Sequence, residues 1–239
     1  MPTEIHIAGT AEQVAEDFAQ YFADWVEKKP LVTVALSGGS TPKVLFRLWA
    51  ERYRGRIDWT KVHFFWGDER CVPPDDEESN FKMANGLFLS RVDIPEGNIH
   101  RIRGEEEPEA EAKRYAKEIT QFVPSRNGLP AFDMILLGMG DDGHTASIFP
   151  HQMELLTAEA LCAVATHPES GQKRATLTGK VINNAKEVVF LVTGKGKAEK
   201  LEEIIEAKDG SGKYPAAHIE PTHGELHWFV DEAAAGRLK

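Results

Sequence analysis

The chain has 239 residues, of which 41% are hydrophobic and 28% charged, a composition typical of a globular protein with a sizeable core. The formal net charge is −10, from 38 acidic and 28 basic residues, which disfavours nucleic acid or an anionic membrane as the main partner. An acidic protein that binds an anion needs a local group of cations. Each Arg or Lys beside a glycine-rich turn is therefore a candidate for such a group.

The N-terminus has no basic region followed by an apolar stretch, and no apolar run approaches the roughly 20 residues that span a bilayer. We therefore expect a soluble, cytoplasmic protein with no membrane partner. The two cysteines, Cys71 and Cys162, lack zinc-finger or Cys-x-x-Cys spacing and suit a reducing compartment. Cys71 follows Arg70, and it is either an activated thiol or the more common partly buried bystander.

Helical and strand-like patterns alternate along the chain. The first half of the chain predicts a helix capped by Thr10, a strand at 31–36, a helix from Pro42, a strand at 62–66 and a helix capped by Ser79. A charged helix follows from 105–111 to about residue 122, and then a loop at 124–130. The second half predicts strands at 134–137, 161–165 and 187–192, a helix from 194, and a final strand within 226–234 that turns into a short helix. This alternation favours a mostly parallel sheet with helices on both faces. We expect one such α/β domain over residues 1–239.

Asp142 and His144 stand at the end of the most informative stretch of the chain. The apolar run 134–137 suits the interior of a sheet, and the glycines after it let the chain turn sharply. Such a turn presents a carboxylate and an imidazole at the carboxyl end of a strand, where open α/β sheets bind ligands. Because a carboxylate can fix the tautomer of an imidazole, the pattern predicts a group that activates water.

Other interpretations of this turn remain. The chain has nine histidines, most of which must be surface or structural, so His144 gains its weight from its position. A metal held by Asp142 and His144 would need a third ligand, and no spacing indicates one. Neither Ser37 nor Ser147 lies in a Gly-x-Ser-x-Gly elbow, which disfavours a serine nucleophile. We expect no metal and no other cofactor.

A second glycine-rich segment, Ser37-Gly-Gly-Ser-Thr-Pro42, follows the strand predicted at 31–36. Proline is favoured in the first turn of a helix, so a helix is expected to begin there. The N–H groups and hydroxyls before it would then surround an anion with the help of the helix dipole. The residues in question are Gly38, Gly39, Ser40 and Thr41. The alternative is a tight turn in which Ser or Thr merely caps the helix.

Three further clusters carry charge. The strand at 62–66 is followed by Asp68 and Arg70. Arg70 would bind a phosphate or carboxylate through two parallel hydrogen bonds. Three interpretations of Asp68 are open: an acid/base group, a partner of sugar hydroxyls, or a solvated turn carboxylate. Arg174 stands beside a predicted strand. Lys197 repeats the strand–glycine–helix arrangement, although exposed charge is the usual interpretation of a Lys-rich stretch.

In chain order these motifs resemble the 6-phosphogluconolactonase family. They comprise Ser37–Pro42, Gly67-Asp-Glu-Arg70 with Ser79-Asn80, Gly138–Pro150, Arg174-Ala-Thr-Leu-Thr178, Gly194-x-x-Lys-Ala198 and the tail with Trp228, Asp231 and Ala233-Ala234. The resemblance covers nearly the whole chain. It implies a Rossmann-like α/β fold and hydrolysis of 6-phospho-D-glucono-1,5-lactone to 6-phospho-D-gluconate in the oxidative pentose phosphate pathway.

The resemblance also implies roles for individual residues. His144 would be the general base that activates water, supported by Asp142. Gly38, Gly39, Ser40 and Thr41 would hold the phosphate, and Arg70, Arg174 and Lys197 would add positive charge. Asp68 and Asn80 would act on the sugar side or support the site. The oxyanion donor is left open between an arginine and the backbone N–H groups near Gly140–Gly143.

Two rival functions remain. The first is a sugar-phosphate deaminase or isomerase of the same superfamily, in which a Glu is expected shortly after the His turn; Thr145–Pro150 contains no carboxylate. The second is a non-catalytic sugar-phosphate sensor, which would not need Asp142 and His144. The expected partner is a small phosphorylated sugar lactone and not nucleic acid. The oligomeric state is open, with a monomer favoured.

Overall fold

A six-stranded parallel sheet forms the centre of the computed structural model, which describes residues 3–239. The strand order is β1-β11-β10-β7-β2-β3. The strands are β1 (Thr3–Ala8), β2 (Val32–Leu36), β3 (Val62–Trp66), β7 (Met134–Leu137), β10 (Glu187–Val192) and β11 (Glu225–Asp231). β2, β7 and β10 are buried along their whole length, as expected for parallel strands covered on both faces. The predicted α/β fold is confirmed.

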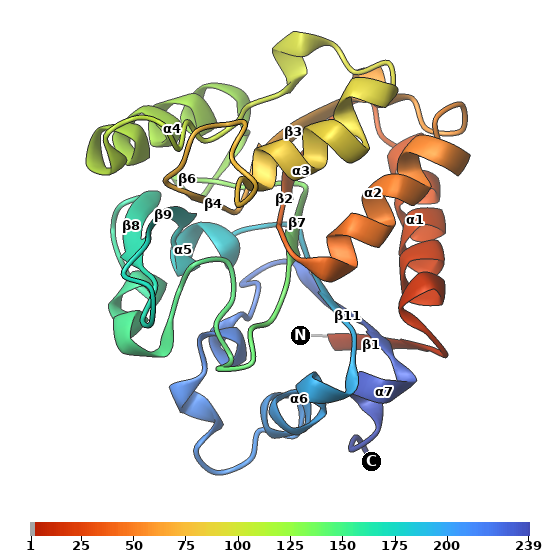
Figure 1. Cartoon of the computed structure of the whole chain (residues 1–239), viewed down its shortest axis with the longest axis vertical. Coiled ribbons are helices and arrows are strands. Elements are labelled where there is room, and N and C mark those ends of the chain that lie inside the picture. Colours follow the sequence, from red (N-terminus) through yellow and green to blue (C-terminus); the bar gives the residue numbers. More distant parts are fainter. Residues whose placement is uncertain (1–2) are drawn as a thin grey trace.

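Helices lie on both sides of this sheet (Figure 1). They are α1 (Ala11–Glu27), α2 (Ser40–Arg52), α3 (Asn80–Leu87), α4 (Pro108–Phe122), α5 (Gly179–Ile182), α6 (Ala198–Ile205) and α7 (Glu232–Ala235). α1 and α2 pack together on one side, and α4 lies on the other. The predicted caps are present: the Thr10 side chain accepts from the N–H of Gln13, and the Ser79 side chain accepts from that of Lys82. Within the described residues, no helix has both the length and the apolar character needed to cross a membrane.

A three-stranded antiparallel sheet adjoins the carboxyl ends of the large sheet. It consists of β4 (Asp68–Arg70), β9 (Lys173–Leu177) and β8 (Cys162–Thr166), in the order β4-β9-β8. α4 packs against β8 and β9. No strand was predicted at 68–70; the segment is a strand because its backbone pairs with β9, more than a hundred residues away along the chain.

The prediction also differs from the structure at β1, in the loop 124–130 and at the start of α2. β1 was not predicted. The segment is short, and it forms a strand because it pairs with β11 at the other end of the chain. The predicted loop 124–130 contains a small hairpin, β5 (Ser125–Arg126) and β6 (Leu129–Pro130). α2 begins at Ser40, two residues before Pro42, because Gly39 turns the chain with a φ of 112°.

The order of the strands creates a crevice. From β2 the chain passes through α2 to β3 on one side, and it later returns to β7 on the other side of β2. Connections that leave in opposite directions open a gap at the carboxyl ends of the two strands, which is where such sheets bind ligands. The two glycine-rich segments follow β2 and β7, so the topology brings them together.

The end of β3 is held by a buried tyrosine. The Tyr115 hydroxyl accepts a hydrogen bond from the backbone N–H of Trp66 at 2.7 Å and donates to the Trp66 carbonyl at 3.1 Å. Tyr115 is fully buried, and burial raises the pKa of its hydroxyl well above the usual value. These bonds complete the backbone hydrogen bonding at the point where the chain leaves β3 for Asp68.

We predict that Tyr115→Phe lowers the free energy of unfolding by about 1–3 kcal/mol, because it leaves a buried N–H and a buried carbonyl without a partner. Urea denaturation measures the effect. Tyr53→Phe is the matched control: the Tyr53 hydroxyl donates to Glu16, a carboxylate that water reaches, so the loss there should be smaller. Equal losses in the two variants would contradict this account.

Candidate active site

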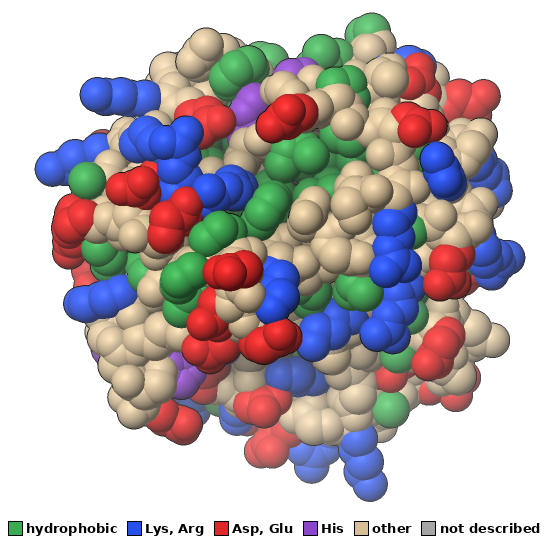
Figure 2. Space-filling view, turned by 45° about the horizontal axis from the view of Figure 1, so that its top comes forward, with side chains coloured by type: hydrophobic (Ala, Val, Ile, Leu, Met, Phe, Trp, Pro, Cys, Tyr) green, Lys and Arg blue, Asp and Glu red, His purple; other side chains and the backbone are tan. Residues whose placement is uncertain are grey.

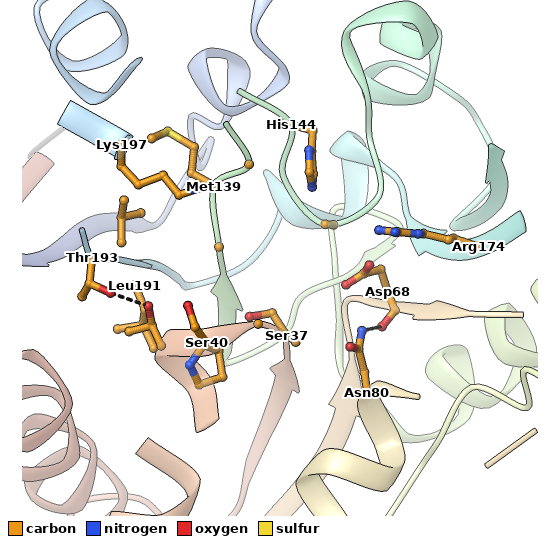
Figure 3. Close-up of a pocket in the computed structure, with 18 of the residues that line it drawn as sticks. Ser37, Ser40, Asp68, Asn80, Met139, His144, Arg174, Leu191, Thr193 and Lys197 are labelled. Carbon is orange, nitrogen blue, oxygen red and sulfur yellow. Dashed lines mark hydrogen bonds between the residues drawn. The ribbon is translucent and has the colours of Figure 1, made fainter. Parts of the chain in front are cut away.

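A cavity of about 200 Å³ lies in the crevice at the ends of β2 and β7 (Figure 3). Every predicted site residue except Asp142 lines it. These residues are Gly38, Gly39, Ser40, Thr41, Asp68, Arg70, Asn80, His144, Arg174 and Lys197. They come from segments of both sheets that are far apart in sequence, so the structure brings together nearly the whole set that the motifs indicated.

Asp142 lies behind His144 and does not line the cavity. Its carboxylate oxygen Oδ1 is 2.5 Å from Nδ1 of the His144 ring and accepts the His144 backbone N–H at 3.1 Å. Partial burial by itself would raise the pKa of Asp142, but the contacts with His144 lower it to about 2. The carboxylate is therefore ionised and can only accept, so Nδ1 must carry the proton. In the neutral ring, the lone pair is then on the other nitrogen, Nε2.

The turn is shaped so that this pair fits. A Cβ on Gly140 would lie 2.1 Å from Nδ1 of His144 and 2.7 Å from Oδ1 of Asp142, so only glycine leaves room for them. Gly143 has a φ of 79°, a conformation that favours glycine. The His144 ring projects into the cavity and packs at 4.8 Å from the Phe149 ring.

Two backbone N–H groups of this turn are already used. Gly140 donates to the His144 carbonyl at 2.9 Å, and Gly143 donates to the Gly140 carbonyl at 3.1 Å. These two groups close the turn and are not free for a ligand.

The N-terminus of α2 forms the floor of the cavity. No side chain among residues 3–239 caps this helix, so the N–H groups of its first turn face the cavity together with the positive end of the helix dipole. Only glycine fits at position 38, because a Cβ there would lie 2.0 Å from Oδ1 of Asn80. The Asn80 amide donates in turn to the Asp68 carbonyl at 3.0 Å.

Two arginines face each other across the small sheet. Arg70 on β4 is directly opposite Arg174 on β9 in the register. Burial, together with the charge of Arg70, lowers the pKa of Arg174, while Asp68 opposes this shift. Bringing two guanidinium groups together costs free energy unless an anion lies between or beside them. On the face that Figure 2 shows, basic and acidic side chains are interspersed.

Asp68 is held in a fixed orientation. It is 5% exposed, and its Oδ2 accepts a hydrogen bond from the Ser147 hydroxyl at 2.7 Å. It is therefore not a solvated turn carboxylate. On the opposite side of the cavity, Lys197 is paired with Asp141 at 2.5 Å. The loop that carries Lys197 is anchored by Asp231, whose carboxylate accepts the N–H of Gly194 at 2.9 Å.

Several residues that line the cavity were not singled out from the sequence. They are Met139, Ala146, Leu191, Val192 and Thr193. Thr193 contacts the Thr41 hydroxyl at 2.8 Å, and its place directly after a predicted strand was the signal that could have identified it. Ala146 has a φ of 47°, a strained conformation for alanine that no sequence pattern reveals.

Cys71 is a bystander. It is half-buried, and burial, followed by the charge of Glu69, raises the pKa of its thiol to about 11. A thiol with a raised pKa is a poor nucleophile at neutral pH. This supports the second of the two interpretations that the sequence left open.

Known proteins share this architecture. The family model for glucosamine-6-phosphate isomerases/6-phosphogluconolactonase matches residues 7–228. The 6-phosphogluconolactonase of Haemophilus influenzae is 46% identical over 230 residues, which cover 96% of this chain and 97% of the relative. A crystal structure described as the devB protein, also 46% identical, superposes with a TM-score of 0.95 over the full length of both chains.

A monomeric glucosamine-6-phosphate deaminase has a TM-score of 0.81, covers 98% of this chain and 99% of its own, and is 22% identical, which shows a likeness of fold alone. The family match and the close relatives agree on membership. The chain belongs to the glucosamine-6-phosphate isomerase/6-phosphogluconolactonase family.

Proposed function

We propose that the chain hydrolyses 6-phospho-D-glucono-1,5-lactone to 6-phospho-D-gluconate, the lactonase step of the oxidative pentose phosphate pathway. One observation carries the proposal: an imidazole whose Nδ1 is paired with Asp142 faces the same cavity as an uncapped helix N-terminus. The first can activate water and the second can hold a phosphate. Relatives that cover nearly the whole chain are named 6-phosphogluconolactonase, which supports this choice.

The phosphate binds at the N-terminus of α2. The N–H groups of Gly38 to Thr41 and the Ser40 hydroxyl donate to its oxygens, and the helix dipole favours its negative charge. Lys197 adds a cation from the side of β10, and Arg70 adds one from the small sheet. Because the phosphate is remote from the reacting carbon, its binding energy serves to orient the lactone.

His144 then acts as general base. Its Nε2 takes a proton from a water molecule as the water oxygen attacks the lactone carbonyl carbon, and Asp142 stabilises the imidazolium that forms. The tetrahedral intermediate collapses with cleavage of the ring C–O bond. The proton returns from His144 to the departing ring oxygen, which gives the open-chain acid. Arg174 stabilises the oxyanion, since its guanidinium group lies near Asp68 at the same cavity.

Asp68 and Asn80 position the sugar. Their hydrogen bonds to Ser147 and to the backbone fix both side chains before substrate arrives. A fixed carboxylate and amide suit the hydroxyl groups of a sugar acid. We also propose that the whole chain acts as one unit, because the cavity draws its lining from residues 37 to 197.

The deaminase or isomerase alternative is less well supported. Its chemistry needs a further acid/base group, and Asp68 is the only carboxylate residue among the described residues that line the cavity. The likeness to a deaminase extends to the fold alone. A sensor would have no use for the Asp142–His144 pair.

The first prediction from this proposal concerns turnover. Lactone generated in place from glucose 6-phosphate should disappear faster with the protein than by spontaneous hydrolysis, and His144→Ala should lose roughly 100- to 10,000-fold in kcat. His223→Ala, which removes an exposed histidine, is the control and should keep full activity. Absence of acceleration by the wild type would refute the proposed function, and an active His144→Ala variant would refute its mechanism.

A second prediction tests the position of the ring without removing a functional group. Gly140→Ala should lower kcat by at least about 10-fold, since its Cβ would displace the His144 imidazole and misplacement of a catalytic group is costly. Gly86→Ala, whose Cβ meets nothing within 4 Å, should behave as wild type. Steady-state kinetics with circular dichroism as a folding check decides the matter; equal kcat values in the two variants would count against the arrangement.

The third prediction concerns phosphate. Arg70→Ala should raise KM about 10- to 100-fold, the loss expected for charged hydrogen bonds, with a smaller change in kcat. Arg91→Ala on the surface serves as control. Unphosphorylated gluconolactone should be a much poorer substrate for the wild type and should be nearly insensitive to Arg70→Ala. An unchanged KM, or equal rates for the two lactones, would remove the phosphate assignment.

A further inference from the structure

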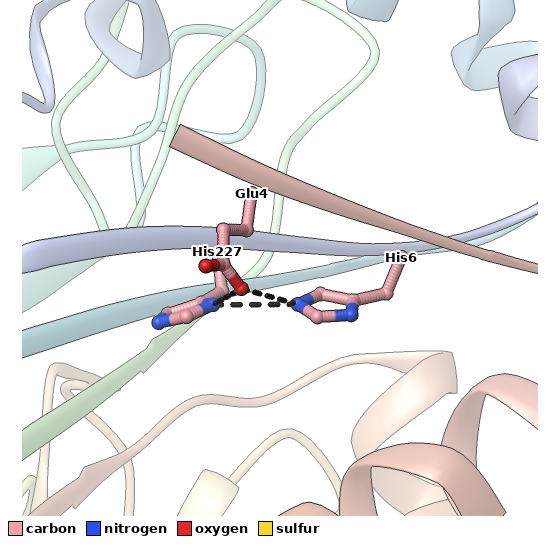
Figure 4. A group of neighbouring side chains, drawn as sticks. All are labelled: Glu4, His6 and His227. Carbon is pink, nitrogen blue, oxygen red and sulfur yellow. Dashed lines mark hydrogen bonds and ion pairs between the residues drawn. The ribbon is translucent and has the colours of Figure 1, made fainter. Parts of the chain in front are cut away.

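Two histidines and a glutamate meet at one edge of the parallel sheet (Figure 4). Glu4 and His6 lie on β1, and His227 lies on β11, directly opposite Glu4 in the register. Because alternate residues of a strand share a face, the three side chains project from the same face of the sheet. That face is covered by α1, whose Tyr21 ring lies 5.5 Å from the His227 ring. Within the part of the chain that the structure describes, none of these three residues lines the lactone cavity.

The three donor atoms form a nearly equilateral triangle. Nε2 of His6 is 3.3 Å from Nδ1 of His227, and Oε2 of Glu4 is 3.6 Å from each of these nitrogens. Tetrahedral zinc with bonds of about 2.0–2.2 Å has ligand atoms about 3.3–3.6 Å apart. An ion about 2.1 Å from all three atoms would therefore lie just outside the plane of the triangle.

Hydrogen bonding accounts for only one side of this triangle. A hydrogen bond between nitrogen and oxygen is about 2.7–3.2 Å long, and both distances from Glu4 to the rings exceed it. The two rings are at best weakly bonded to each other at 3.3 Å. A shared cation would satisfy all three groups at once.

The surroundings prepare the rings for metal binding. His6 stacks on the Phe229 ring with 4.2 Å between centroids, which fixes its plane. The His227 side chain is 3% exposed, and its other nitrogen, Nε2, has no hydrogen bond within residues 3–239 but lies 3.4 Å from the Glu225 carboxylate. A proton on Nε2 facing Glu225 leaves the Nδ1 lone pair free, and a carboxylate behind a histidine is the usual support of a metal ligand.

We propose that Glu4, His6 and His227 bind a divalent transition-metal ion of the zinc type, which ties the edge strand β1 to β11. Glu4 is exposed and His6 half-exposed, so the ion can enter from solvent and a water molecule can complete the coordination. The site is separate from the proposed lactone chemistry. Its role is structural, since an ion that binds only the folded chain stabilises it.

The test is a titration of chelator-treated protein with Zn²⁺, followed by calorimetry, and with Co²⁺, followed by its visible spectrum. All variants carry His144→Ala, so that the lactone site cannot contribute a histidine. We expect one Zn²⁺ per chain at micromolar concentration or tighter, a tetrahedral Co²⁺ spectrum, and a higher melting temperature with metal. His6→Ala and Glu4→Gln should weaken binding by at least about 100-fold and 10-fold, and Glu225→Gln by about 10-fold.

The matched control is His223→Ala, which removes an exposed histidine near β11 and should leave affinity unchanged. Both His6→Ala and Glu4→Gln alter accessible side chains, so both variants should fold. Folding is checked with His6→Ala in a chain that keeps His144, where the rate of lactone hydrolysis should equal that of the wild type. Binding that is weaker than millimolar, that persists equally in His6→Ala and Glu4→Gln, or that gives an octahedral Co²⁺ spectrum overturns the proposal. Failure of the lactonase assay would leave these outcomes unaffected.

Discussion

The gap between the carboxyl ends of β2 and β7 is the constraint on which the proposed active site depends. These strands are neighbours in a parallel sheet, yet the connections that follow them leave in different directions. The N-terminus of α2 and the turn that ends in His144 therefore face one cavity. Each segment alone would be a common structural element, and the chemistry arises from their shared location.

Steric exclusion and charge complete the arrangement. Gly38 and Gly140 lack a Cβ where Asn80 and His144 approach most closely, so the backbone itself makes room for the side chains. Arg70 and Arg174 are set against each other by the ladder of the small sheet, and the free energy of their repulsion falls when an anion binds. A protein with a net charge of −10 thus has a local group of cations at this cavity.

The small antiparallel sheet has a larger part in this than its size indicates. β4 carries Asp68 and Arg70, and β9 carries Arg174, so three of the proposed site residues depend on one pairing. The edge strand β1 has a comparable position at the other side of the molecule. It is held by β11, and the proposed metal would add a second link between the two strands.

The local sequence determined five of the six strands of the large sheet and the identity of the candidate groups. Periodicity predicted β2, β3, β7, β10 and β11, because buried parallel strands are short continuous apolar runs. The glycine-rich turns predicted which polar residues stand at strand ends, and the family resemblance ordered their roles.

Other features were decided only by tertiary structure. β1 and β4 form through pairing with residues that are distant in sequence. The local sequence of such a short segment does not reveal its pairing partner. The fixing of Asp68 by Ser147, the pairing of Lys197 with Asp141 and the meeting of His6 with His227 likewise depend on distances across the fold. The sequence by itself determined which groups are available and in what local conformation; the folded chain decided which of them lie within a few ångströms of one another, because hydrogen bonds and metal ligation act only over that range.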